Sequence, residues 1–91
     1  MNKVVVHKSH LLPDQDTILE VPVEAFKIIH TEEQNGVPTV WYETIKNPIM
    51  TNKVTLCYIG TGMNIPDNST HIGSCRCGVY MWHIYQINKG K

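Results

Sequence analysis

The sequence predicts an all-β protein, a small antiparallel β-sandwich or barrel of about six or seven short strands. Segments with a period of two, rich in Val, Ile, Thr, Tyr and Trp, recur along the chain with turn residues between them. A helical period never persists for three turns. Because 91 residues suffice for one core only, we expect a single β domain over residues 1–88 and a frayed tail at 89–91.

The N-terminal half is expected to contain four strands. They are predicted at residues 3–9, 17–22, 25–34 and 38–45. The third is expected to alternate Phe26, Ile28 and His30 against Lys27, Ile29 and Thr31. Asn35-Gly36 separates the third and fourth strands, and both residues accept the positive φ that a type I′ hairpin turn requires.

The fourth predicted strand raises a question about its aromatic residues. Trp41 and Tyr42 are adjacent, so a strand must point one of them away from the other. Pro38 lacks an amide donor and is expected at the strand start or on an edge. The outward aromatic ring predicts a partner or ligand surface, with core packing as the alternative.

The C-terminal half is expected to contain three strands, at residues 53–60, 71–77 and 79–87, with a loop at 61–70. The last strand is apolar on both of its alternating faces. Such a strand is predicted to be central in a sheet, to lie in a barrel wall against another element, or to lie at an oligomer interface. We therefore expect a homo-oligomer.

Composition excludes several classes of function. The eight basic and eight acidic residues balance, and Arg76 is the only arginine, so duplex nucleic acid is not an expected partner. The chain has neither an apolar run long enough to span a bilayer nor a signal-peptide pattern, which predicts a cytoplasmic protein without membrane contact.

Three segments resemble a family of short phage and prophage proteins. They are QNGVPTVWYE (34–43), YIGTGMNIP (58–66) and HIGSCRCGVYMWHIY (71–85). The family has a Gln-x-Gly-x-Pro-x-x-Trp hairpin, a Gly-Thr-Gly loop and a closing Val-x-x-Trp/Phe-His strand, and it is a domain of unknown function. The resemblance implies a phage protein in the host cytoplasm with a compact β fold, but no catalytic residues. Two positions depart from the pattern: Met63 replaces a common histidine, and His71 replaces an aromatic residue.

Metal and catalytic chemistry are not expected. Cys75 and Cys77 are spaced to share one face of a strand, unlike a zinc knuckle, and buried free cysteine behaves as a small hydrophobe. His83 is predicted to be a hydrogen-bonded core histidine. The acidic residues are dispersed, so we predict no enzyme, no cofactor and no metal.

The glycine-containing loop has two interpretations. Gly60 and Gly62 lack the following Gly-Lys-Ser/Thr of a phosphate-binding loop, and Pro66 interrupts any helix behind them. The segment is therefore either a strand connection or one wall of a binding pocket.

These observations predict a phage accessory protein that acts by binding, with counter-defence as its role. One mechanism sequesters a nucleotide-like signal at a pocket or subunit interface, with a base on Trp41 or Trp82 and phosphates on loop amides and Arg76 or a lysine. The alternatives are an inhibitor that docks on a host defence protein through a sheet edge or aromatic patch, and a structural accessory without ligand. The candidate ligand-binding residues are Trp41, Gly60, Thr61, Gly62, Asn64, Arg76, Trp82 and His83.

Overall fold

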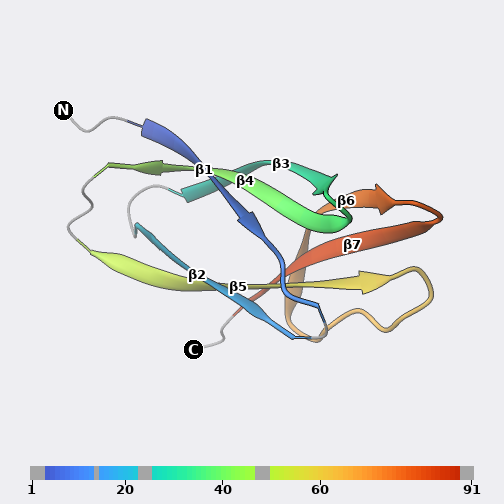
Figure 1. Ribbon diagram of the computed structural model, residues 1–91. Coiled ribbons are helices and arrows are strands. Elements are labelled where there is room, and N and C mark those ends of the chain that lie inside the picture. Colours follow the sequence, from blue (N-terminus) through green and yellow to red (C-terminus); the bar gives the residue numbers. More distant parts are fainter. Residues whose placement is uncertain (1–3, 14, 23–25, 47–49, 89–91) are drawn as a thin grey trace.

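Seven strands form two antiparallel sheets in the computed structural model, which describes residues 4–13, 15–22, 26–46 and 50–88 (Figure 1). The prediction of an all-β sandwich is confirmed. The Cα atoms extend over 44 × 32 × 16 Å, so the molecule is a flat, two-layer body. None of the described residues belongs to a helix that could cross a membrane. The predicted tail at 89–91 lies outside the described residues.

The three-stranded sheet, here sheet A, has the order β1-β4-β3. Its strands are β1 (Val4–His10), β3 (Phe26–Gln34) and β4 (Val37–Ile45). Asn35 and Gly36 join β3 to β4 with φ of 54° and 81°, as the predicted hairpin turn requires. The Gly36 N–H donates to the Glu33 carboxylate, which fixes this turn. Pro38 is the second residue of β4, near the predicted strand start.

The four-stranded sheet, sheet B, has the order β2-β5-β7-β6. Its strands are β2 (Thr17–Pro22), β5 (Thr51–Gly60), β6 (Ser69–Cys77) and β7 (Tyr80–Ile87). The apolar last strand is central, as predicted, because β5 and β6 pair with its two edges. Both β5 and β6 begin two residues earlier than expected.

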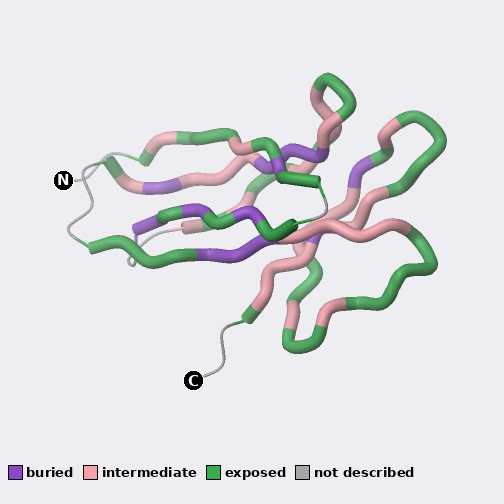
Figure 2. The backbone as a smooth tube through the Cα atoms, turned by 60° about the horizontal axis from the view of Figure 1, so that its bottom comes forward, coloured by how far each residue is buried: buried purple, intermediate pink, exposed green. Residues whose placement is uncertain are grey.

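The core lies between the two sheets. Its buried hydrophobic members come from both sheets and from the segment after β1; they are Leu11, Leu19, Val21, Val40, Val54, Leu56 and Ile84. Most of the long loop after β5 and the tip of the β6–β7 hairpin are exposed (Figure 2). Along each strand, every second residue counted from these core positions therefore points to the inner face.

A close seam joins the sheets where β3 and β6 lie side by side (Figure 1). Each of these strands has a register shift, at Ile29 and at Ile72. The Thr31 hydroxyl donates to the carbonyl oxygen of Ser74 at 3.2 Å. A Cβ atom on Gly73 would lie 2.6 Å from Thr31 Oγ1, so only glycine permits this approach.

The bulge in β3 corrects the predicted alternation of that strand. His30 pairs with Trp41, whereas Thr31 pairs with the core residue Val40. Phe26 and Ile28 pack against the core, so the extra residue Ile29 moves His30 to the outer face and Thr31 to the inner face. A single period of two could not anticipate this change of phase.

Candidate functional site

An aromatic groove of about 500 Å³ runs beside the end of β5. The last pair between β2 and β5 is Thr17 with Leu56, so β5 continues for four residues beyond its neighbour. The groove forms along this extension. Its lining residues are Pro13, Gln15, Asp16, Cys57, Tyr58, Met63 and Trp82. Three segments that are distant in the sequence thus build one concave surface.

Three aromatic rings are clustered at this end of sheet B. The Tyr58 and Trp82 rings meet edge to face with centroids 5.1 Å apart, and Tyr80 stacks on Trp82 at 5.9 Å. Trp82 shares the inner face with Ile84, two residues along β7. Tyr80 is 64% exposed. The cluster therefore begins at the core and ends in solvent.

The glycine loop closes one side of the groove. The Met63 N–H donates to the Gly60 carbonyl at 3.1 Å, and the Gly60 N–H donates to Met63 Sδ at 3.2 Å. A Cβ atom on Gly60 would approach the Trp82 ring to 3.3 Å. Gly62 has a φ of 94°, which favours glycine. The glycines thus serve a strand connection whose turn brings Met63 onto the aromatic cluster, while the role of the loop in binding stays a prediction.

The groove is apolar with an acidic group at its edge. Among the described residues that line it, Asp16 is the carboxylate and none is basic. Burial, and secondarily the Asp16 carboxylate, raise the pKa of the Cys57 thiol. This electrostatic environment suits a cationic ligand better than an anionic one.

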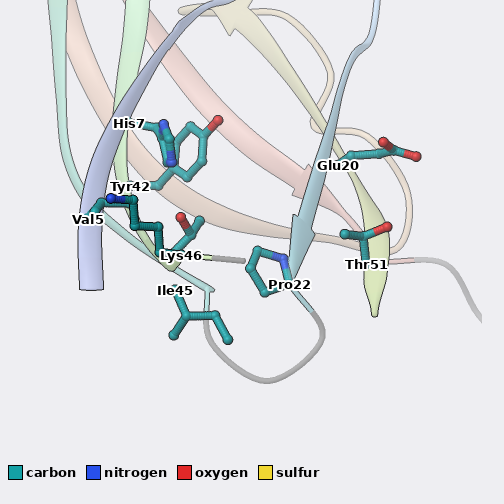
Figure 3. A pocket seen from close by; sticks show the side chains of 9 residues that line it. Val5, His7, Glu20, Pro22, Tyr42, Ile45, Lys46 and Thr51 are labelled. Atoms are coloured by element: carbon teal, nitrogen blue, oxygen red, sulfur yellow. The ribbon is translucent and has the colours of Figure 1, made fainter. Parts of the chain in front are cut away.

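A second cavity of about 450 Å³ lies between the sheets at another end of the sandwich (Figure 3). His7 and Tyr42 lie side by side there with ring centroids 5.7 Å apart. Burial raises the pKa of Tyr42. Glu20 and Lys46 add charged groups to the lining. None of the predicted ligand-binding residues lines this cavity.

A row of hydrogen-bonded polar side chains crosses the outer face of sheet B. This histidine row consists of Thr61, His83, Ser74 and His71. Thr61 Oγ1 lies 3.0 Å from His83 Nε2, Ser74 Oγ lies 2.9 Å from His83 Nδ1, and His71 Nε2 lies 3.2 Å from Ser74 Oγ. The His71 ring also meets Tyr85 edge to face at 5.3 Å. His83 is therefore hydrogen-bonded, as predicted, but it is half-buried on the outer face rather than in the core.

The predicted ligand-binding residues occupy three separate places. Trp41 neighbours the core residue Val40 and hence points from the outer face of sheet A, while Tyr42 points inward. Trp82 and Gly60 meet at the aromatic groove. The remaining residues are exposed in the glycine loop or lie on the outer face of sheet B; they are Thr61, Gly62, Asn64, Arg76 and His83.

Two of the three cysteines, Cys75 and Cys77, lie on the inner side of β6. Cys75 pairs with Trp82 and Cys77 with Tyr80, so both thiols share one face, as their spacing predicts. Burial, followed by the neighbouring Cys77 and Glu33, raises the pKa of Cys75 to about 11. Within the described part of the chain, no group of three or more His, Cys, Asp or Glu side chains is arranged for a metal ion.

Sequence reasoning missed several residues of these sites. Asp16, Tyr58 and Met63 of the groove come together because β2 begins opposite Leu56, which leaves the rest of β5 without β2 beside it. Ser74 could have been found from the sequence. The alternation of β6 and β7 allows a hydroxyl and an imidazole on paired antiparallel strands to hydrogen-bond.

The comparisons with known proteins give one family. No curated protein and no solved structure matches the chain. The model of DUF7352, a domain of unknown function, matches residues 1–91. The match covers the two sheets, the aromatic groove and the histidine row, and the chain therefore belongs to the DUF7352 family.

Proposed function

We propose that this protein acts by binding, and that the aromatic groove holds a proline-rich, basic segment of a protein partner. The single observation that carries the proposal is the groove itself. Tyr58, Trp82 and Met63 form apolar walls, and Asp16 is the charged group at the edge. Aromatic-lined grooves of this kind recognise extended proline-rich segments, whose shape costs little entropy to fix.

Each wall of the groove fits one part of such a segment. The edge-to-face pair of Tyr58 and Trp82 offers flat surfaces for proline rings. Met63 is 60% exposed and flexible, so it can adapt to the segment. The Asp16 carboxylate complements a lysine or arginine of the partner.

Exposed apolar residues extend the contact surface beyond the groove. Ile65 in the glycine loop is 61% exposed, and Val79 and Tyr80 at the hairpin tip are 92% and 64% exposed. Apolar side chains exposed together favour contact with a partner or with a second copy of the chain. On the resemblance to short phage proteins, we place this binding in the host cytoplasm, as inhibition of a defence protein.

Sequestration of a nucleotide-like signal is the second candidate, and it stays a prediction. The exposed stack of Tyr80 on Trp82 favours it, because a nucleobase can stack there. Arg76, which is predicted to hold the phosphates unless a lysine does, lies on the outer face of β6, whereas Trp82 points from the inner face of β7. One ligand can use both only at a subunit interface.

Trp82 fluorescence tests the proposal directly. Trp41→Phe leaves Trp82 as the sole tryptophan. Proline-rich peptides with one arginine should shift its emission with a Kd on the order of 10–100 μM, the range of weak peptide grooves. Asp16→Asn should weaken binding about threefold to tenfold by removing the charge pair. Unchanged emission across a peptide panel would contradict the proposal.

Photocrosslinking locates the contact independently of fluorescence. A photoreactive residue in place of Met63 should crosslink the peptide, whereas the same residue in place of Met50 should not. Met50 is a matched control because it is 63% exposed, against 60% for Met63, and does not line the groove. Native mass spectra with cyclic and NAD-derived nucleotides test the second candidate: a stoichiometric adduct without peptide binding would replace the first proposal by the second.

A further inference from the structure

We propose that the histidine row on the outer face of sheet B, together with Arg76, forms a binding site for a phosphate monoester that fills below neutral pH. This site is distinct from the aromatic groove, because His83 and Trp82 are consecutive in β7 and point from opposite faces of the sheet. It also does not depend on the proposed peptide binding.

The placement of the residues follows from the register of β6 and β7. Ser74 pairs with His83, and Arg76 pairs with Met81, so Ser74, Arg76 and His83 point from the same face. Arg76 lies about 7 Å from Ser74 along the strand, a distance that its long side chain can span. His71 and Thr61 complete the surface through their hydrogen bonds to Ser74 and His83.

The electrostatics of this face favour an anion. The three strands β5, β6 and β7 contain no aspartate or glutamate. The other titratable side chains that face the row from these strands are Arg76, Tyr85 and Cys57, and the Asp16 carboxylate acts on Cys57 from the segment before β2. The row has no carboxylate among its hydrogen-bond partners. A positive charge on an imidazole here would have no acidic partner within these strands.

Protonation also changes which hydrogen atoms the row offers. When both imidazoles are charged, His71 Nε2–H and His83 Nδ1–H donate to Ser74 Oγ, and His83 Nε2–H donates to Thr61 Oγ1. The Ser74 and Thr61 hydroxyl hydrogens are then released for another acceptor. A phosphate monoester, whose second pKa is about 6, carries one to two negative charges and three strongly accepting oxygens, and it matches two hydroxyl donors beside the positive charges of two imidazolium groups and a guanidinium.

Titration with phenyl phosphate tests the site. The imidazole NMR signals of His71 and His83 should shift with phenyl phosphate at pH 6, and binding should be at least about tenfold weaker at pH 8, because the proposed site uses charged imidazoles. Ser74→Ala and Arg76→Gln should each weaken binding about threefold to tenfold. His30→Gln, on the outer face of sheet A, should have no effect.

The outcomes separate the site from general ion effects. Arg76 is exposed, so Arg76→Gln keeps the test valid if Ser74→Ala disturbs the fold. Equal binding at pH 6 and pH 8, or equal shifts with chloride at the same ionic strength, would overturn the proposal. Tighter binding of adenosine monophosphate than of O-phosphoserine would support the site with a nucleotide as the natural source, and the reverse would support it with a phosphorylated side chain.

Discussion

The outer faces of the two sheets both present a histidine beside an aromatic ring, but in different electrostatic surroundings. On sheet A, the His30 and Trp41 centroids are 5.3 Å apart, and His30 Nε2 lies 2.7 Å from the Glu32 carboxylate. On sheet B, His71 lies at the same distance from Tyr85 but bonds to the Ser74 hydroxyl. Thus one histidine has an acidic partner and the other has a neutral one.

The difference lies in the charges of the strands as well as in single contacts. Strands β3 and β4 contain three glutamates, Glu32, Glu33 and Glu43, whereas the three C-terminal strands contain none. A chain without net charge thus has acids on the strands of sheet A, while in sheet B Glu20 lies on β2 and the strands β5, β6 and β7 have none. Zero net charge therefore does not exclude a local anion site, although it argues against many phosphate contacts on a duplex.

The largest effect on stability is expected at the seam between β3 and β6. Gly73→Ala places a methyl group against Thr31, and we expect it to lower the free energy of unfolding by about 1–3 kcal/mol. Urea denaturation measures the change. Thr31→Ala removes the two closest atoms, so Gly73→Ala should cost clearly less in that background; equal costs in both backgrounds would mean that the seam is not the cause.

A rise in pH should reduce stability through a residue on the inner side of β6 and not through one on its outer side. The pKa of Cys75 is about 11 in the folded protein, against 9.0 when it is unperturbed. Because the folded pKa is raised, the contribution is fully present below pH 9 and is lost as the pH rises toward 11. We expect Cys75 to account for about 1 kcal/mol of lost stability between pH 8 and pH 10.

Paired denaturation curves measure that contribution. Cys75→Ala should flatten the alkaline part of the profile, while the outward Arg76→Gln should leave its slope unchanged. A Cys75→Ala protein that loses stability as steeply as the unmodified protein would contradict the assignment.

The smallest effect is expected on the sheet A face. Glu32→Gln removes the acidic partner of His30, but both side chains are more than half exposed. The free energy of unfolding should fall by less than about 1 kcal/mol, and the difference should shrink in high salt. Thermal melts at two salt concentrations measure it. A loss comparable to that of Gly73→Ala would show that this ion pair is structurally important.

The sequence predicted the strands better than it predicted their pairing and their assignment to the two sheets. The alternation of apolar residues and the Asn35-Gly36 turn identified all seven strands and the central place of the last one. The bulge at Ile29 and the assignment of β2 to sheet B depend on contacts between distant segments, which local patterns do not contain.

The candidate sites were predictable only in part. Trp82 and Gly60 do meet, and His83 and Thr61 do hydrogen-bond, so the glycine loop was a useful signal. Trp41 appeared equivalent to Trp82 in the sequence, yet it lies on the other sheet and faces away from the core. Which face an aromatic residue occupies depends on register, and register is set by the assembled sheet.

The place of β2 has a consequence for the order of events during translation. This strand leaves the ribosome between β1 and β3, but the strand with which it pairs, β5, is synthesised some thirty residues later. Leu19 and Val21 must therefore wait uncovered while β3 and β4 already form their hairpin. Folding on the ribosome should stall at sheet A, and completion should require release of the C-terminal strands, when nascent chains are most open to chaperones and to proteases.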